Sequence, residues 1–317
     1  MWETDLPNGH GTYTRPDGER YEGMFKDGMK HGTGTCVYAS GQRYEGMWET
    51  DLPNGHGTYT RPDGERYEGM FKDSKRHGKG TCVYASGQRY EGMWENGLPN
   101  GHGTYTWPDG ERYEGMFKDS KRHGKGTCVY ASGQRYEGMW ENGLPNGHGT
   151  YTWPDGERYE GMFKDGMKHG TGTCVYASGQ RYEGMWETDL PNGHGTFTWP
   201  DGERYEGMFK DSKRHGKGTC VYASGQRYEG MWETDLPNGH GTYTRPDGER
   251  YEGMFKDSKR HGKGTCVYAS GQRYEGMWET DLPNGHGTYT RPDGERYEGM
   301  FKDSKRHGLG CQRHTGG

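Results

Sequence analysis

The sequence predicts an all-β protein: an elongated, twisted, single-layer antiparallel β-ribbon made of stacked hairpins. The leading observation is a repeat, because Tyr-Glu-Gly-Met followed by an aromatic residue recurs thirteen times, every 23 residues, from Tyr21 to Tyr297. Self-similarity at a short fixed period is typical of repeat architectures. Glycine also falls every few residues and no stretch shows helical periodicity, which excludes long helices. The repeat unit must therefore be built from strands and turns.

Two kinds of 23-residue unit alternate strictly along the chain. The odd unit, as in residues 67–89, reads YEGMFKDSKRHGKGTCVYASGQR, and the even unit, as in residues 90–112, reads YEGMWENGLPNGHGTYTWPDGER. The chain accordingly divides into a partial repeat at residues 1–20, twelve complete repeats at 21–296, and an incomplete repeat with an irregular tail at 297–317.

Within the odd unit the residues alternate with period two, as expected for a strand. Tyr67, Gly69 and Phe71 are predicted on one face, and the residues between them on the other. A polar turn is expected at residues 73–78, followed by a second strand at 79–85. The glycines on the aromatic side carry no Cβ, so a ring from an adjacent strand can lie over their backbone.

The remaining turns are expected at residues 86–88 in the odd unit and at 98–101 and 108–110 in the even unit. Asn-Gly and Asp-Gly steps in the even turns tolerate φ > 0 and are strong hairpin signals. Each 23-mer is therefore predicted to be one hairpin of a continuous antiparallel sheet. Two strands at about 4.8 Å give roughly 10 Å per repeat, and an array on the order of 130 Å long.

The composition agrees with an ordered chain that lacks a conventional aliphatic core. Only 27% of the residues are hydrophobic and the mean hydropathy is −1.32, yet 14% are aromatic. Disordered chains are poor in aromatic residues, so rings at fixed phase are expected to replace the usual core. The formal charge of −5 creates no field that attracts nucleic acid. We expect neither a nucleic-acid partner nor a small-molecule substrate.

The beginning of the sequence, MWETDLPNG, has neither the basic nor the apolar segment of a signal peptide. The longest apolar run, Cys-Val-Tyr-Ala, is far shorter than the roughly 20 residues that span a bilayer. We expect a cytoplasmic protein, either free or peripheral to a membrane or the cytoskeleton.

Cysteine and histidine occur at fixed phases that favour packing over chemistry. Six cysteines are spaced by 46 residues from Cys36 to Cys266, whereas disulfide frameworks and zinc sites need clustered cysteines. The His-Gly-Lys-Gly-Thr segment lacks the residue order of a phosphate loop. We therefore expect no metal, no cofactor and no catalytic residue, and we interpret the chain as a non-enzyme.

The pattern Y-x-G-x-[FW]-x₆-G-x-G, as in Tyr67, Gly69, Phe71, Gly78 and Gly80, resembles the MORN (membrane occupation and recognition nexus) repeat over nearly the whole chain. The resemblance implies an elongated, twisted antiparallel ribbon that serves as a scaffold or recognition arm. Arrays of this family tether membranes, bind partner segments in their groove, or self-associate. No kinase, SET or transmembrane segment accompanies the repeats, so the resemblance carries over no enzymatic activity.

The aromatic face is the leading candidate for a binding surface, because no helix in the sequence can cover it and large exposed apolar patches mark interaction sites. Either the rings bury one another, or they accept a protein partner or a second copy of the chain. Trp107, Trp153 and Trp199 stand where other even units have Arg, which makes the central repeats the more adhesive ones. The partner-binding candidates are Tyr90, Trp94, Tyr105, Trp107, Tyr136, Trp140, Tyr151, Trp153 and Trp199.

Basic residues in the odd turns support an alternative function, a membrane tether that binds anionic phospholipid. The simpler interpretation is solvated charge that discourages edge association. A third hypothesis is a regulatory fragment of a larger enzyme, such as a phosphatidylinositol phosphate kinase. The lipid-binding candidates are Lys75, Arg76, Lys79, Lys121, Arg122 and Lys125.

Overall fold

The computed structural model describes residues 6–313, which form 27 β-strands. This described range contains no helix, and therefore none that could cross a membrane. The chain divides into two compact units: the first runs to Pro154 and includes Phe163–Gly166, and the second comprises residues 155–162 and those from Met167 onward. Each unit is an open antiparallel sheet, which confirms the predicted all-β architecture of stacked hairpins.

The strands of the first unit are β1 (Gly9–Thr14), β2 (Arg20–Lys26), β3 (Met29–Val37), β4 (Arg43–Glu49), β5 (Leu52–Thr60), β6 (Arg66–Lys72), β7 (Lys75–Val83), β8 (Arg89–Glu95), β9 (Leu98–Thr106), β10 (Arg112–Lys118), β11 (Lys121–Val129), β12 (Arg135–Glu141) and β13 (Leu144–Thr152). Residues of β14 (Arg158–Lys164) belong to both units. The strands of the second unit are β15 (Met167–Val175), β16 (Arg181–Glu187), β17 (Leu190–Thr198), β18 (Arg204–Lys210), β19 (Lys213–Val221), β20 (Arg227–Glu233), β21 (Leu236–Thr244), β22 (Arg250–Lys256), β23 (Lys259–Val267), β24 (Arg273–Glu279), β25 (Leu282–Thr290), β26 (Arg296–Lys302) and β27 (Lys305–Arg313).

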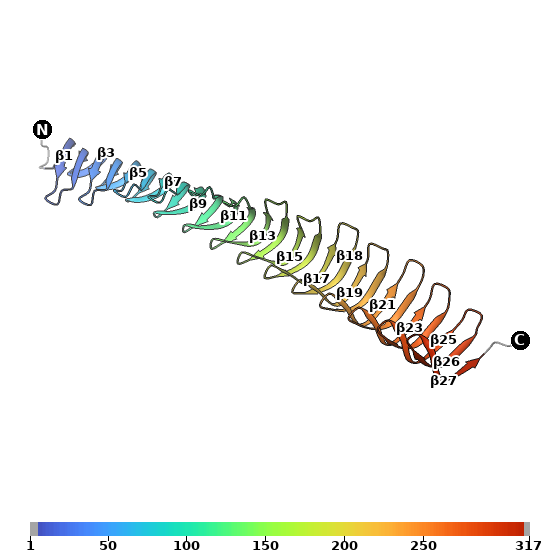
Figure 1. Cartoon of the computed structure of the whole chain (residues 1–317). Helices are drawn as coiled ribbons and strands as arrows, with labels where there is room; N and C mark the ends of the chain where they lie inside the picture. The colour runs from blue at the N-terminus through green and yellow to red at the C-terminus, as the bar shows by residue number, and fades with distance from the viewer. Residues whose placement is uncertain (1–5, 314–317) are drawn as a thin grey trace. The chain divides into compact units, whose positions relative to one another are not determined.

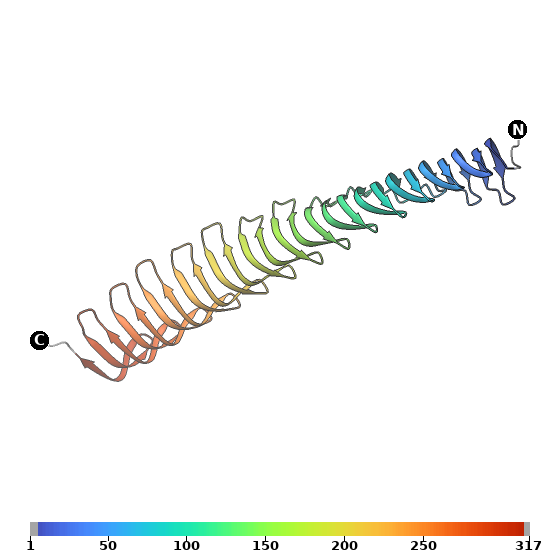
Figure 2. The same ribbon diagram turned by 180° about the vertical axis from the view of Figure 1, so that it is seen from behind.

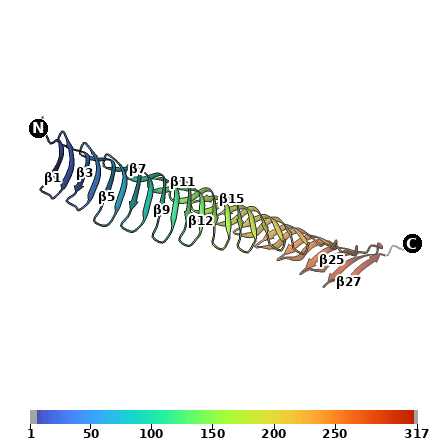
Figure 3. The same cartoon turned by 90° about the horizontal axis from the view of Figure 1, so that it is seen from above.

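Within each unit every strand pairs antiparallel with its neighbours in the chain (Figures 1 and 2). In the first unit, for example, Cys82 on β7 lies opposite Tyr67 on β6 and opposite Tyr90 on β8. Seen from above, the strands of each unit make a single layer (Figure 3). Successive repeats are therefore joined by the same ladder of backbone hydrogen bonds that joins the two strands of one hairpin.

The tight turn of the odd unit is shorter than its sequence suggests. It consists of Asp73 and Ser74 alone, both with positive φ (48° and 66°), as a two-residue hairpin turn requires. The prediction of a turn through residue 78 is wrong, because β7 already begins at Lys75. The extra residues are absorbed in a bulge, where residues 77–79 lie opposite Met70 alone.

The even unit shows the same difference. Its tight turn is Asn96-Gly97, with φ of 51° and 88°, whereas residues 98–101, predicted as a turn, lie in β9. The Asn-Gly step at Gly101 forms the bulge instead, with φ of 92°. The loop at residues 108–110 occurs where it was expected.

The core of each unit is a ladder of aromatic rings on one side of the sheet, called the ring face here. Tyr90 is fully buried and Trp94 is 2% exposed. Tyr90 makes edge-to-face contacts with Trp94 of its own repeat and with Phe117 of the next, both at 5.1 Å between ring centroids. Because each Tyr touches the large ring of two successive repeats, the rings connect the repeats as well as filling them.

Glycine makes room for the tyrosine of each repeat, as the sequence predicts. A Cβ on Gly103 would lie 2.6 Å from Cε2 of Tyr90, and one on Gly92 would lie 2.6 Å from the Tyr90 hydroxyl oxygen. The hydroxyl donates a hydrogen bond to the Met93 carbonyl oxygen at 2.8 Å. The indole Nε1 of Trp94 donates to the Gly80 carbonyl oxygen at 3.1 Å, so the polar atoms of the core are paired.

Candidate functional site

Four of the partner-binding candidates belong to the core. Tyr90 and Tyr136 have no exposed surface, and Trp94 and Trp140 are each 2% exposed. These four must be corrected from binding residues to core residues, because each ring lies against the backbone of its own sheet and the rings of its neighbours. The sequence left open whether the rings bury one another or accept a partner, and these four rings bury one another.

The other five candidates are half-buried and lie near the loops. Trp107 packs against Tyr105 with 4.3 Å between ring centroids, and Arg122 lies over the Trp107 ring at 4.7 Å. Tyr151 and Trp153 make the same 4.3 Å contact, and Trp199 lies 4.4 Å from Phe197. Partner contact through these five residues stays a prediction.

One repeat with arginine at this position has a groove in this part of the ring face. In the tryptophan repeat, Tyr105 stacks on Tyr84 at 6.0 Å. The corresponding rings beside Arg245, Tyr222 and Tyr243, line a groove of about 500 Å³.

Two of the lipid-binding candidates are not at the turn edge. The Arg76 side chain is 15% exposed, forms an ion pair with Glu65, and lies over the rings of Tyr67 and Trp94 at 5.1 and 5.2 Å. Arg122 makes the same ion pair with Glu111. This is a second correction, and its cause is the period of two in β7 and β11, which points these arginines to the ring face.

The remaining basic candidates, Lys75, Lys79, Lys121 and Lys125, are exposed. Lys75 and Lys121 begin their strands next to the tight turns, whereas Lys79 and Lys125 lie further along, on the side of the sheet opposite the rings. The basic residues expected together at one edge are thus separated: the first lysine lies beside the tight turn, the arginine lies on the ring face, and the second lysine lies on the opposite face.

The ion pair on the ring face explains the two odd units that read Gly-Met-Lys. In the first, the ammonium of Lys30 donates to Oε1 of Glu19 at 2.9 Å, in the place of an arginine. This hydrogen bond holds the pKa of the Glu19 carboxyl below its ordinary value. Lys168 lies 3.6 Å from Glu157 in the second such unit. These two units have fewer basic residues than the other odd units, but the cation that the core uses is retained.

Burial makes the core cysteines and tyrosines poor reactive groups. Desolvation raises the pKa of the Cys82 thiol to about 11 and that of the Tyr113 hydroxyl to about 12. A thiol acts as a nucleophile only when it is deprotonated. Among residues 6–313, no three His, Cys, Asp or Glu side chains come together in a way that could hold a metal ion.

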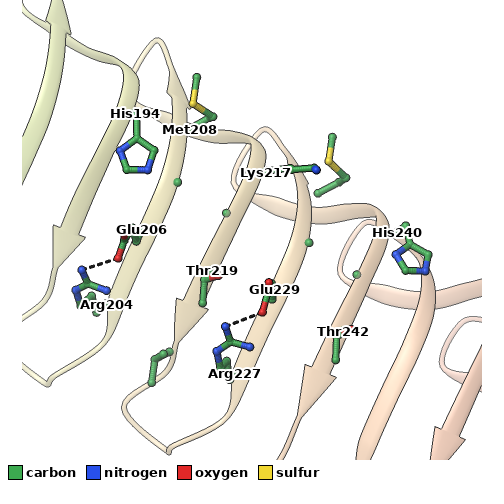
Figure 4. A pocket seen from close by; sticks show the side chains of 16 residues that line it. His194, Arg204, Glu206, Met208, Lys217, Thr219, Arg227, Glu229, His240 and Thr242 are labelled. Carbon is green, nitrogen blue, oxygen red and sulfur yellow. Dashed lines mark ion pairs between the residues drawn. The ribbon is translucent and has the colours of Figure 1, made fainter.

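The side of the sheet opposite the rings, called the groove face here, carries an open groove in each unit. The groove of the second unit has a volume of about 910 Å³ and runs from β17 to β21 (Figure 4). A groove of about 1220 Å³ lined by residues at the same repeat positions lies over β5 to β10 of the first unit. The recurrence follows from the repeat, since each 46-residue pair presents the same side chains in the same order.

One side of the groove is a row of methionine, histidine and lysine, which we call the Met row. It consists of the methionine of each Tyr-Glu-Gly-Met segment and the residue facing it on the preceding strand. Met208 lies opposite His194 and Met231 lies opposite Lys217. The two methionines are 41% and 37% exposed, and Figure 4 shows His194, Met208, Lys217 and His240 along one side of the groove.

The other side of the groove is a row of ion pairs. Arg204 binds Glu206 at 2.7 Å and Arg227 binds Glu229 at 2.6 Å, with every one of these side chains about half exposed. Figure 4 shows both pairs below the Met row. Each pair has no net charge, so Lys217 gives the groove a net positive charge.

The alternation in the sequence predicts the residues between the rings, Glu68 and Met70, on this face but does not identify the face as a site. No single strand shows that the methionines of successive repeats align into one row. The signal that could have found the row is the constant phase of Met in all thirteen repeats.

Family comparison agrees with the repeat architecture. The family model of the MORN repeat matches fourteen consecutive segments, at residues 1–20, 21–43, 44–66, 67–89, 90–112, 113–135, 136–158, 159–181, 182–204, 205–227, 228–250, 251–273, 274–296 and 297–317. No curated protein matches the chain.

Solved structures with detectable similarity include the TCP10 domain of CPAP from Danio rerio in complex with a STIL peptide. It is 15% identical with a TM-score of 0.31, and the match covers 80% of this chain and 96% of that one. A second is the TCP domain of SAS-4 from Drosophila melanogaster in complex with a proline-rich motif of Ana2. It is 13% identical with a TM-score of 0.32, over 56% of this chain and 90% of that one. These TM-scores are too low to establish a common fold.

Proposed function

Since the chain belongs to the MORN-repeat family along its whole length, we propose that it is a non-enzymatic scaffold that binds protein partners in the grooves over the Met row. The observation that carries this proposal is the recurrence of one groove, with the same lining, in both units. A surface that repeats in this way can hold one long partner segment or several copies of a short one.

The side chains of the groove suit contact with protein. Methionine is flexible and polarizable, and it is common on surfaces that bind apolar segments. The exposed Met93 and Met231 provide such contacts, and the ion pairs beside them provide a polar rim. The ring face offers less, because its largest rings already contact one another.

Site-specific photo-crosslinking tests the proposal. A photoreactive residue at Met93 reports the groove face, and one at Trp107, where other repeats carry Arg, reports the ring face. We expect Met93 to crosslink to a polypeptide in a cell extract and Trp107 not to do so. Crosslinks from Trp107 alone would move the site to the ring face, and the absence of polypeptide crosslinks from both positions would contradict protein binding.

The exposed lysines beside the tight turns support a second candidate, contact with anionic phospholipid. Changing Lys75, Lys121, Lys213, Lys259 and Lys305 to Ser, while keeping the core arginines, should abolish salt-sensitive binding to phosphoinositide vesicles. Binding that is insensitive to both salt and this change would contradict it. Self-association, a role as part of a larger enzyme and a cytoplasmic location also stay predictions.

A further inference from the structure

We propose that the segment bound in the groove is an amphipathic α-helix with an apolar residue at every seventh position and carboxylates beside it. This inference rests on the proposed function, because it names the occupant of the same groove. Three observations support it: the spacing of the Met row, the flexible apolar side chains of its methionines, and the charge of its lysines.

The spacing of the Met row matches a helical heptad. Successive methionines, such as Met208 and Met231, lie on alternate strands of the sheet, so they are about 9.6 Å apart along the row. Seven residues of an α-helix rise about 10.5 Å. A helix lying along the row therefore presents about one residue to each methionine, with a mismatch of about 0.9 Å per heptad that the flexible methionine side chains can absorb.

An extended strand fits the row less well. Three extended residues also span roughly 10 Å, but an odd step turns alternate side chains to opposite faces. A strand could thus contact only every second methionine from one side.

A polyproline helix repeats every three residues and about 9.3 Å, which matches the spacing. Its usual receptors, however, are grooves lined by aromatic rings. In this chain the buried rings lie on the opposite face, whereas flexible Met-rich grooves accept amphipathic helices.

The charge of the groove selects an acidic helix. Within the Arg204–Glu206 pair and within the Arg227–Glu229 pair the two charges cancel. The net charge of the groove is therefore that of Lys217 in the Met row. Lysine recurs at this phase at Lys263, 46 residues on and four strands further, or about 19 Å. Fourteen helical residues rise about 21 Å, which is close to this distance, so a carboxylate in every second heptad can meet each lysine.

The chain itself provides a matched control for this lysine. Thr33 and Thr171 occupy the same phase, are exposed and face Met47 and Met185 in the same register. Lysine is therefore not needed for folding at this position, and Lys→Thr substitutions remove charge without altering the repeat.

The test uses the full chain and four fluorescent 28-residue peptides of defined design. The first is a helix with Leu in every heptad and Glu beside it, the second replaces Glu by Lys, the third scrambles the order, and the fourth is a polyproline peptide with Leu at every third position. We expect the acidic helix to bind at least about tenfold more tightly than the other three. Equal or tighter binding of any of the others would overturn the proposal.

The quadruple variant K79T/K125T/K217T/K263T should weaken binding of the acidic helix at low salt by about tenfold or more. An unchanged circular dichroism spectrum shows that it has folded. Unchanged affinity in the folded variant would overturn the role of the lysines.

The outcome is separable from that of the proposed function. If Met93 crosslinks to a polypeptide but the acidic helix does not bind, the helical occupant is wrong and the scaffold function stands. If neither occurs, both are wrong.

Discussion

The two faces of the sheet are made by neighbouring residues of the same strand, yet they differ in almost every property. In β6 and β8 alike, the segment Tyr-Glu-Gly-Met-aromatic sends alternate side chains to opposite sides. Tyr90 and Trp94 are buried, whereas Met93 between them is 37% exposed. The fold is thus specified by one face alone. The other face is free to carry a binding surface, because nothing in the core depends on it.

The ring face has little tolerance because each ring serves two repeats. Trp94 makes edge-to-face contacts with Tyr67 at 5.2 Å and with Tyr90 at 5.1 Å. In a repeat protein stability is the sum of terms within repeats and between neighbours. A substitution in this ladder of rings therefore weakens both the repeat itself and its contact with the next repeat. Its effect on stability should be measured locally, by hydrogen exchange of the adjoining strands.

The largest effect is expected for Trp94→Ala. Deleting a buried indole costs about 3–5 kcal/mol, so the amide hydrogens of β7 to β9 should lose protection. The control is Met93→Ala, next to it on the groove face, which should cost under about 1 kcal/mol because the side chain is largely in water. Similar losses for the two variants would contradict the division between the faces.

A smaller but substantial effect is expected for Gly103→Ala. The added Cβ would lie 2.6 Å from a Tyr90 ring carbon, and overpacking of this kind costs about 1–3 kcal/mol. Thr104→Ala, the next residue along β9, should change the free energy of local unfolding by less than about 0.5 kcal/mol. Full protection of β8 and β9 in the Gly103→Ala chain would show that the ring does not lie on this backbone.

The half-buried ion pair should contribute less than the rings. Arg76→Gln removes the cation beside Glu65 and should cost about 1.5–2 kcal/mol, at the lower end of the range for hydrogen bonds to charged groups. Arg76→Lys should restore most of it, because Lys30 makes the corresponding ion pair with Glu19 at 2.9 Å. Equal hydrogen exchange in the Gln and Lys variants would contradict a stabilising pair.

The smallest effect on stability is expected at the Met row. Lys79→Thr should leave the free energy of local unfolding within about 0.5 kcal/mol of the parent, since Thr33 stands at the same phase. Its effect should appear in binding alone. Urea unfolding monitored by hydrogen exchange checks the first statement, and a marked loss of protection would show that the groove face also supports the fold.

The sequence was sufficient for the fold but not for the site. The 23-residue period, the alternation around Tyr67 and the glycines opposite the rings predicted the strands and the ring face. The predicted turns at residues 73–78 and 98–101 are too long, because Gly78 and Gly101, which have the positive φ typical of turn residues, lie in bulges within β7 and β9. The predicted turn includes Arg76 and therefore puts this residue at the edge of the sheet. In the structure β7 begins at Lys75, so the Arg76 side chain lies on the ring face.

The most direct test of the account is a nuclear magnetic resonance experiment on the full chain with labelled methionine methyl groups and labelled tryptophan indoles. It is recorded without and with the acidic heptad peptide, or with a partner segment identified by crosslinking. The account predicts that the methyl signals of groove residues such as Met93 and Met231 shift on binding, while the indole signals of core residues such as Trp94 and Trp232 stay in place. Shifted indole signals with unchanged methyl signals would place the partner on the ring face and contradict the account.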